Sequence, residues 1–357
     1  MKVITILGAR PQFVKAAMVS NIIRHYGELN EVIIHTGQHF DDQMSGIFFT
    51  DMNIPRSKYN LGIHSLSHAA MTGRQLERIE EILLEEKPDY VLVYGDTNST
   101  LAGALAGAKL NIPVVHIEAG LRSFNKKMPE EINRVLTDHL SELLFVPTTS
   151  AVNNLESEGI QQERIHLVGD VMCDAVLHFS HLAENSSTIL SDLGLIDKEY
   201  ILATVHRQGN TDSLKKLQNI FSSFSECSLP VVIPLHPRTK KKIEELDIHI
   251  NGSVRIVEPV GYLDMLILEK NANKIATDSG GVQKEAYFFH VPCITLRDET
   301  EWIELVEIGA NQIVGTDRGE ITKALNGDVP AFSSSLDFGE GKTSRKIVEI
   351  MYKNEIK

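Results

Sequence analysis

The stretch Thr-Asp-Ser-Gly-Gly-Val-Gln-Lys-Glu-Ala, residues 277–286, marks a place where a strand turns into a helix. A short apolar run ends just before it and a helical pattern leaves it, so Ser279, Gly280 and Gly281 fall at a helix N-terminus. The first backbone N–H groups of a helix have no partner within the helix, and the helix dipole adds partial positive charge. Such a turn suits a phosphate or diphosphate. Alternatively, Asp278 or Ser279 only caps the helix and the glycines make a tight turn.

The same alternation of strand and helix runs along the whole chain. Strand-like apolar runs lie at 3–7, 32–35, 90–94, 114–117, 143–146, 166–168, 201–205, 231–235, 254–257, 274–276, 293–296 and 312–314. Strands that alternate with helices predict parallel sheets covered on both faces. We therefore expect an α/β protein with two doubly wound, Rossmann-like domains facing a cleft. The expected domains are 1–170 and 171–357, with a last helix at about 344–356 that packs on either one.

Composition narrows the classes of partner. The chain has 357 residues and a formal net charge of -13, which disfavours nucleic acid and anionic membranes as partners. Cys173, Cys227 and Cys293 lie far apart and match no metal spacing, which indicates a reducing compartment. The sequence begins with no secretory apolar run and contains no stretch of about 20 apolar residues. We expect a cytoplasmic protein whose site supplies positive groups locally if the ligand is anionic.

Acidic side chains follow strand-like runs in the first half. Asp96 and Glu118 each come directly after such a run, and Glu130 and Glu131 follow Pro129 at a predicted helix start. If the two strands are neighbours, Asp96 and Glu118 share one sheet edge. Carboxylates brought together repel one another, so at least one acquires a raised pKa and serves as an acid or base. Taken singly, Asp96 could cap a helix, and the glutamate pair could only complement the helix dipole.

Positive side chains also follow strand-like runs, in both halves of the chain. They are Arg10, Lys15, His206, Arg207, His236 and Arg238. Each could be an ordinary surface charge. A cation after a strand in each domain is nevertheless what an acidic protein needs in order to hold a diphosphate.

Metal and nicotinamide sites have little support. His116, Glu118 and His139 could surround one ion, but no HExxH, CxxC or Asp-x-Asp spacing accompanies them. The turn after the first strand lacks the GxGxxG of dinucleotide binders. The residues alone therefore indicate an enzyme that acts on a phosphorylated, nucleotide-linked compound.

Five motifs together resemble the non-hydrolysing UDP-N-acetylglucosamine 2-epimerase family, in order and over nearly the whole chain. They are Gly-Ala-Arg-Pro-Gln-Phe-Val-Lys at 8–15, Tyr-Gly-Asp-Thr-Asn-Ser-Thr at 94–100, His-Ile-Glu-Ala-Gly-Leu-Arg at 116–122, Pro-Glu-Glu-Ile-Asn-Arg at 129–134 and the stretch at 277–286. The resemblance implies the two-domain GT-B fold, a UDP-sugar substrate and a homodimer. It implies that no metal or nicotinamide cofactor is needed.

The resemblance also implies roles for residues. Family members eliminate UDP across C1 and C2 of the sugar, forming a bound 2-acetamidoglucal, and then add UDP back with the proton on the opposite face. The implied catalytic group is Asp96, Glu118, Glu130, His206 and Lys15. The implied substrate-binding group is Arg10, Arg207, His236, Ser279, Gly280, Gly281 and Glu285, with the Ser-Gly-Gly turn on the diphosphate and Glu285 on the ribose.

Some details depart from members that act on UDP-N-acetylglucosamine. Trp302 stands where those members carry an arginine, and the motif at 8–12 reads Gly-Ala-Arg-Pro-Gln. In these details the chain resembles the subgroup that epimerises UDP-2,3-diacetamido-2,3-dideoxy-glucuronic acid to the manno form for surface polysaccharide such as lipopolysaccharide O-antigen. Lys126 and Lys127 would then meet the uronate, unless they are two solvated loop lysines. The general UDP-N-acetylglucosamine 2-epimerase, a GT-B glycosyltransferase and a non-catalytic sugar-nucleotide binder remain alternatives.

Overall fold

The chain forms two compact units. The computed structural model describes residues 1–38, 54–235, 237–246, 248, 250, 252–328, 332, 336 and 338–355. The first unit is Met1–Leu177 together with Asp337–Lys357, and the second is His178–Leu336. The division falls inside helix α7 (Val171–Ser186), and the last helix, α16 (Thr343–Glu355), belongs to the first unit.

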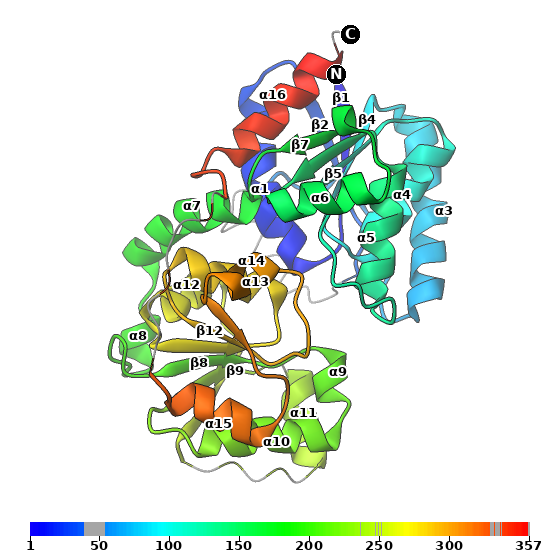
Figure 1. The fold of residues 1–357 in the computed structure, drawn as a ribbon. Coiled ribbons are helices and arrows are strands. Elements are labelled where there is room, and N and C mark those ends of the chain that lie inside the picture. Colours follow the sequence, from blue (N-terminus) through cyan, green and yellow to red (C-terminus); the bar gives the residue numbers. More distant parts are fainter. Residues whose placement is uncertain are drawn as a thin grey trace. The chain divides into compact units, whose positions relative to one another are not determined.

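The first unit is built on a parallel sheet of seven strands in the order β3-β2-β1-β4-β5-β6-β7. The strands are β1 (Lys2–Leu7), β2 (Asn30–His35), β3 (Tyr59–Asn60), β4 (Tyr90–Tyr94), β5 (Val114–Ile117), β6 (Leu143–Val146) and β7 (Ile165–Leu167). The helices of this unit are α1 (Arg10–His25), α3 (His68–Glu86), α4 (Asn98–Lys109), α5 (Pro129–Leu140) and α6 (Thr149–Ser157), with a short 3₁₀ turn at Gln162–Arg164. Figure 1 shows α1 and α16 on one side of the sheet and α3, α4 and α5 on the other.

The central strands of this sheet are the most apolar part of the unit. Every residue of β4 and β5 is buried, because helices cover both faces and leave no solvated side. Tyr94 pairs in register with Ile117, so these two strands end side by side. The residues that follow them therefore emerge at the same edge of the sheet.

The last helix lies on the first helix of the same unit. The rings of Tyr26 and Tyr352 are 5.5 Å apart between centroids. Asp174 on α7 accepts hydrogen bonds from the backbone N–H groups of Thr343 (3.1 Å) and Ser344 (2.7 Å) at the start of α16. These bonds satisfy N–H groups that a helix start leaves without partners.

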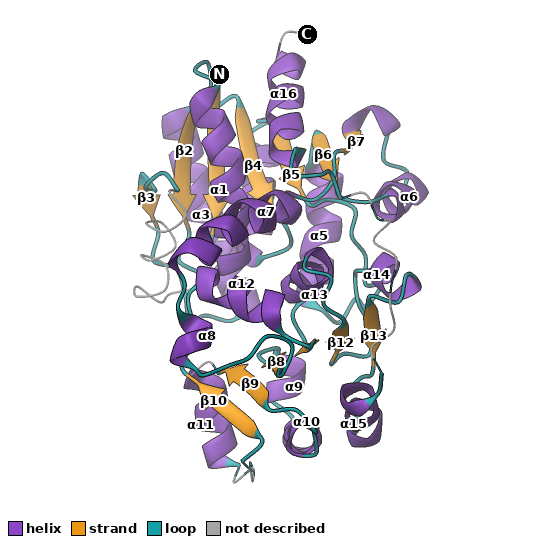
Figure 2. Ribbon diagram, turned by 90° about the vertical axis from the view of Figure 1, so that its left-hand side faces the viewer, coloured by secondary structure: helices purple, strands orange, loops and turns teal. Residues whose placement is uncertain are grey.

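The second unit repeats the architecture with a six-stranded parallel sheet in the order β10-β9-β8-β11-β12-β13. Its strands are β8 (Ile201–Thr204), β9 (Val231–Pro234), β10 (Val254–Val257), β11 (Lys274–Thr277), β12 (Cys293–Thr295) and β13 (Asn311–Ile313). Its helices, besides the end of α7, are α8 (Ile189–Asp192), α9 (Gln208–Thr211), α10 (Leu214–Ser225), α11 (Pro237–Glu245), α12 (Tyr262–Asn271), α13 (Gly280–Phe288), α14 (Ile303–Glu307) and α15 (Arg318–Asn326). Figure 2 shows α10 and α15 on one side of this sheet and α12 and α13 on the other.

The predicted fold class is confirmed, since both halves are doubly wound parallel α/β units. Each strand-like run of the sequence overlaps an observed strand, and among the strands of the described residues only the two-residue β3 was not predicted by the pattern. That strand is too short to show a period. Within the described residues, no helix is long and apolar enough to span a membrane.

Candidate active site

Lys15 and Glu118 form a buried ion pair at the carboxyl edge of the first sheet. Lys15 lies on α1, Glu118 follows β5, and their side chains are only 8% and 11% exposed. Glu118 has a backbone φ of +70°, in the left-handed region that non-glycine residues seldom occupy. Gly95, with φ +63°, lies against the pair, and a Cβ added there would sit 3.2 Å from Glu118 Oε2. The turn after β4 thus leaves room for the carboxylate of the turn after β5.

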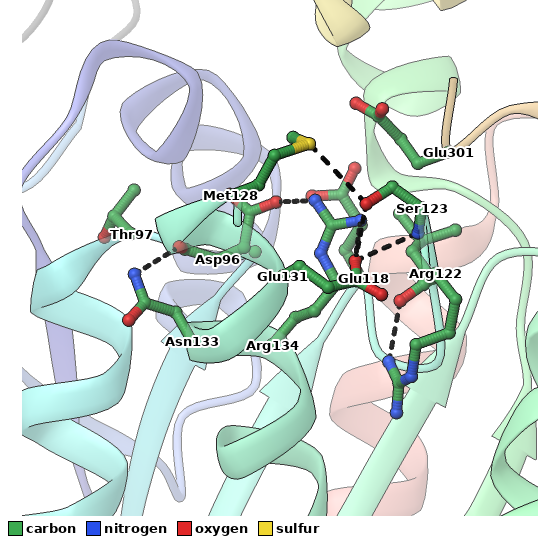
Figure 3. Close-up of polar contacts among 12 residues, drawn as sticks. Asp96, Thr97, Glu118, Arg122, Ser123, Met128, Glu131, Asn133, Arg134 and Glu301 are labelled. Atoms are coloured by element: carbon green, nitrogen blue, oxygen red, sulfur yellow. Dashed lines mark hydrogen bonds and ion pairs between the residues drawn. The ribbon is translucent and has the colours of Figure 1, made fainter. Parts of the chain in front are cut away.

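Asp96 pairs with Arg134, a buried arginine on α5. Figure 3 shows Arg134 reaching the Asp96 carboxylate, which is 32% exposed. The same guanidinium lies 3.3 Å from Glu131 Oε2, and Asn133 Nδ2 donates to the backbone carbonyl of Asp96 at 2.9 Å. Helix α5 therefore holds Asp96 through its side chain and its backbone together.

The two adjacent acids of α5 have different environments. Glu131 is buried and accepts hydrogen bonds from Ser123 N–H (2.9 Å), the Ser123 hydroxyl (2.9 Å) and Phe124 N–H (2.8 Å). The interpretation that both acids only complement the helix dipole is thus wrong for Glu131, which fixes the loop before α5. Glu130 is half-buried, and among the described residues it makes no hydrogen bond or ion pair. Its carboxylate is the one left available for a ligand.

The Lys15–Glu118 pair lines a small hollow at this edge of the sheet. Its other walls come from the ends of β5, β6 and β7, from the start of α7 and from α16: Ile117, Phe145, Pro147, Val168, Gly169, Asp170, Val171 and Ile347. Most of this lining is apolar, so the two charges interact in surroundings of low polarity, where an ion pair is stronger than in water.

A second polar network, largely buried, lies near this edge. His116 Nδ1 lies 2.7 Å from Asp138 Oδ1, and its Nε2 lies 2.7 Å from the Gly95 carbonyl oxygen. Arg122 donates to Asp138 (2.7 Å) and to both carboxylate oxygens of Glu158 (2.7 Å each). Both ring nitrogens of His116 are therefore engaged within the protein. Sequence analysis missed Asp138 and Arg134, because each is recognised only as the partner of a residue in another element.

The expected acid group is thus largely assembled in the first unit. The structure places Asp96 and Glu118 after the neighbouring strands β4 and β5, pairs Lys15 of α1 with Glu118, and places Glu130 at the start of α5. The imagined metal arrangement around His116 is not formed, since Glu118 pairs with Lys15 instead. Among the described residues, no group of His, Cys, Asp and Glu is arranged to hold a metal ion.

In the second unit, Asp278 fixes the turn that carries the cations. It follows β11, is fully buried, and accepts hydrogen bonds from His206 N–H (3.1 Å), Arg207 N–H (3.0 Å) and Asn210 Nδ2 (3.1 Å). Asp278 is therefore not the cap of α13, as one alternative held. Ser279 is the residue whose hydroxyl accepts from Val282 N–H of α13, at 3.4 Å. His206 and Arg207 remain 54% and 27% exposed in their side chains.

Gly280 makes room for a carboxylate of the protein itself. A Cβ added there would lie 2.2 Å from Glu301 Oε1, whereas at Gly281 the nearest atom would be the Ser279 hydroxyl oxygen at 3.8 Å. Glu301 pairs with the buried Arg297 (2.8 Å) and lies 3.7 Å from Arg207. Sequence analysis missed Arg297, although it follows β12 and the strand-end rule would have found it.

For three further residues of the expected site, the structure gives only a position or no description at all. Glu285 lies buried on α13. Arg10 begins α1, but its side chain lies outside the described part of the structure, as does the whole of His236. Trp302, which marks a departure from the sequence pattern, is buried with Lys284 Nζ 4.2 Å from its ring centroid. This is a cation–π contact.

Comparisons with known proteins agree over the whole chain. A family model described as UDP-N-acetylglucosamine 2-epimerase matches residues 21–352. A Methanococcus maripaludis protein named UDP-N-acetylglucosamine 2-epimerase homolog is 54% identical over 98% of this chain and 99% of its own length. The UDP-2,3-diacetamido-2,3-dideoxy-D-glucuronate 2-epimerase of Pseudomonas aeruginosa is 50% identical over 99% of this chain and 100% of its own.

A solved structure is equally similar. The crystal structure of Methanocaldococcus jannaschii UDP-GlcNAc 2-epimerase in complex with UDP-GlcNAc and UDP matches with a TM-score of 0.92 and 44% identity, covering 99% of this chain and 100% of that one. The likeness extends over both Rossmann-like units, so the expected GT-B fold is confirmed.

Proposed function

Since the chain belongs to the UDP-N-acetylglucosamine 2-epimerase family and is a UDP-sugar 2-epimerase, we propose that its substrate is UDP-2,3-diacetamido-2,3-dideoxy-glucuronic acid. The product is the manno epimer. The observation that carries this choice is the loop before α5, where Lys126 and Lys127 are exposed. Glu131 holds the start of that loop, and Glu130 follows its end. A uronate adds one carboxylate to the sugar, and two lysines beside the acids supply matching charge.

The proposed reaction is elimination of UDP followed by its addition. A carboxylate removes the proton from C2 while the C1–O bond breaks, which yields UDP and a bound 2-acetamidoglycal. UDP then adds back at C1, and a second carboxylate delivers a proton to the opposite face of C2. Two faces require two acid–base groups, drawn from Asp96, Glu118 and Glu130. Lys15 balances the charge of Glu118 while the proton moves.

The second unit is proposed to hold the diphosphate. Breaking the C1–O bond leaves negative charge on the departing phosphate, and preorganised donors stabilise such charge best. The start of α13 at Ser279, Gly280 and Gly281 offers backbone N–H groups, and His206 and Arg207 offer positive side chains on a turn that Asp278 fixes. The remaining proposed contacts are Arg10 and His236 to the diphosphate and Glu285 to the ribose.

We further propose the setting of this activity. The product would serve synthesis of surface polysaccharide such as O-antigen, the enzyme would act in the cytoplasm as a homodimer, and it would need no metal or nicotinamide. The similarity to the Pseudomonas aeruginosa enzyme supports the choice of sugar, since that enzyme is named for the same UDP-linked uronic acid. Size-exclusion chromatography with light scattering would test the dimer.

The second candidate is the general UDP-N-acetylglucosamine 2-epimerase. It is favoured by the Methanococcus maripaludis relative at 54% identity and by the likeness to a structure that holds UDP-GlcNAc. A neutral sugar has no need of the lysines before α5, so the loop distinguishes the two candidates.

One experiment separates them. The protein is incubated in D₂O with UDP-N-acetylglucosamine and, separately, with the 3-acetamido uronic analogue, and C2 is followed by NMR. We expect deuterium at C2 and a manno product from the uronic analogue alone. Exchange with the simple sugar would favour the general epimerase, and no exchange with either would contradict the proposed chemistry.

A further inference from the structure

His116 stands between two hydrogen-bond acceptors. It lies in β5 and is fully buried. Its Nε2 is 2.7 Å from the carbonyl oxygen of Gly95, and its Nδ1 is 2.7 Å from Asp138 Oδ1. A carbonyl oxygen can only accept, so Nε2 carries a proton. The charge of the ring then depends on which partner holds the proton between Nδ1 and Asp138.

Asp138 is ionised by its other contacts. Its second oxygen accepts from the Arg122 guanidinium at 2.7 Å and from Gly120 N–H at 3.1 Å. Burial raises the pKa of Asp138, whereas the charge and hydrogen bond of the Arg122 guanidinium lower it and favour the ionised carboxylate. A carboxylate that accepts at both oxygens leaves Nδ1 of His116 as a donor. Both ring nitrogens therefore donate, which defines an imidazolium.

The ring joins the two turns that carry the acids. The Gly95 carbonyl belongs to the peptide group whose N–H is that of Asp96, and Gly120 comes two residues after Glu118. Through Asp138, the cation also orients the Gly120 N–H. We propose that His116 is a buried imidazolium that positions Asp96 and Glu118 for proton transfer at C2 of the sugar.

The backbone conformation of Glu118 explains why the turn that carries it needs hydrogen-bond partners to hold it in place. Gly95 reaches its φ of +63° without strain, whereas Glu118 has φ +70°, a backbone conformation that a non-glycine residue seldom adopts. Such conformations persist only where the surroundings over-determine them. Beside an ionised Asp138, a neutral imidazole would donate only one of the two hydrogen bonds and would release one turn. The positive ring donates to both the Gly95 carbonyl and Asp138, and it thereby holds the turns of Asp96 and Glu118 relative to each other.

The charges around the ring balance. His116 and Arg122 face Asp138 and Glu158, so the cluster holds two cations and two anions. His139, which is 46% exposed, lies 3.4 Å from Glu158 at the outer end of the cluster. A buried pair that is fully hydrogen-bonded tolerates its desolvation, whereas removing one member leaves an uncompensated buried charge.

The test compares His116→Gln with His166→Gln. His166 lies on β7 of the same sheet, and in the described structure its Nε2 has no hydrogen-bond partner. We expect His116→Gln to fold and to lower kcat about 100-fold, as misplaced catalytic groups do. KM and the Kd for UDP should stay within about twofold, because diphosphate contacts are unaffected. The control should match wild type. The Asp96 amide resonance should shift in the first variant and stay unchanged in the control.

A second measurement is independent of turnover. Two-dimensional ¹⁵N NMR at neutral pH should show two protonated ring nitrogens for His116 in the wild-type protein. One unprotonated nitrogen would overturn the imidazolium. An unchanged kcat and an unchanged Asp96 amide in His116→Gln would overturn the positioning role. The proposal rests on the roles proposed for Asp96 and Glu118. If the wild-type protein epimerised no UDP-sugar, the proposed function would fail. The ¹⁵N spectrum would still show whether the His116 ring is protonated at both nitrogens. The Asp96 amide shift would still show whether His116 positions the Asp96 turn.

Discussion

The two units both place functional side chains near the ends of parallel strands, but they differ in which charged groups are buried and which stay accessible to a ligand. In both, these residues follow the carboxyl ends of central parallel strands. In the first unit the cation Lys15 is buried and paired with the acid Glu118. In the second, backbone N–H groups hold the buried carboxylate of Asp278, while His206 and Arg207 stay accessible.

This difference follows from what each unit is proposed to do. A carboxylate that exchanges protons must have its charge balanced by the protein, since the substrate carbon offers none. A diphosphate brings its own charge, so its site needs exposed cations on a rigid turn. One topology thus serves two tasks: the first unit places a buried cation against an acid, and the second uses a buried acid to fix a turn whose cations stay accessible.

The largest expected effect removes an acid from the first unit. Glu118→Gln should lower kcat by about 10²- to 10⁴-fold, because general acid–base catalysis contributes that much. The affinity for UDP should change little, since this glutamate lies in the first unit. Steady-state kinetics and calorimetric titration with UDP would measure the two effects. Glu142→Gln, at an exposed carboxylate of the same unit, is the control. An equal loss of UDP affinity would place Glu118 among the binding residues.

The matching change in the second unit is Asp278→Ala. Loss of this buried acceptor leaves the N–H groups of His206 and Arg207 unpaired, which should lower the free energy of unfolding by about 1–3 kcal/mol. UDP affinity should fall by about tenfold because the cationic turn is released. Urea denaturation and calorimetry would measure both quantities. The exposed Asp197→Ala is the control, and unchanged UDP binding in Asp278→Ala would separate this turn from the diphosphate.

The buried charge of Asp138 should be visible in the pH dependence of stability. Its pKa is below the usual value of 3.8 in the folded protein, so its ionised form stabilises the fold above that value. This contribution is lost as the pH falls through the lowered pKa. Wild type should therefore lose stability more steeply than Asp138→Asn between about pH 5 and pH 3. Denaturant titrations at several pH values would give the two slopes. Equal slopes would contradict the ionised Asp138.

A smaller effect should separate the two glycines of the second unit. At Gly280 an added Cβ meets Glu301, whose flexible carboxylate must move, so Gly280→Ala should lower the free energy of unfolding by about 1 kcal/mol. At Gly281 no such contact exists. If a diphosphate lies against this helix start, Gly281→Ala should weaken UDP binding with no loss of stability. Thermal unfolding with and without UDP would measure both, and unaltered UDP binding in both variants would argue against the proposed position.

The smallest effect concerns substrate choice. Replacing Lys126 and Lys127 by alanine should raise KM for the uronic substrate by about two- to fivefold, since exposed charge pairs contribute about 0.2–1 kcal/mol. KM for a neutral UDP-sugar should not change. Replacing the exposed Lys109 and Lys353 together is the matched control. An equal rise for both sugars would remove the proposed role of the loop.

The sequence by itself determined the architecture and the positions of most candidate residues. Apolar runs alternating with helical patterns are local features, and they located the described strands of both sheets except the two-residue β3. The rule that parallel strands present their carboxyl ends at one edge then selected Asp96, Glu118 and the turn at Ser279. These inferences succeed because a run of buried residues and a strand end can be read from neighbouring positions alone.

Only the tertiary structure decided which charges meet. Arg134 lies 38 residues from Asp96, Asp138 lies 22 residues from His116, and no local pattern connects them. Their pairing follows from the strand order and from the way α5 packs beside the sheet. The same holds for Glu131, which fixes a loop while its neighbour Glu130 does not. Helix periodicity sends adjacent side chains in different directions, and only the surrounding fold determines what each one touches.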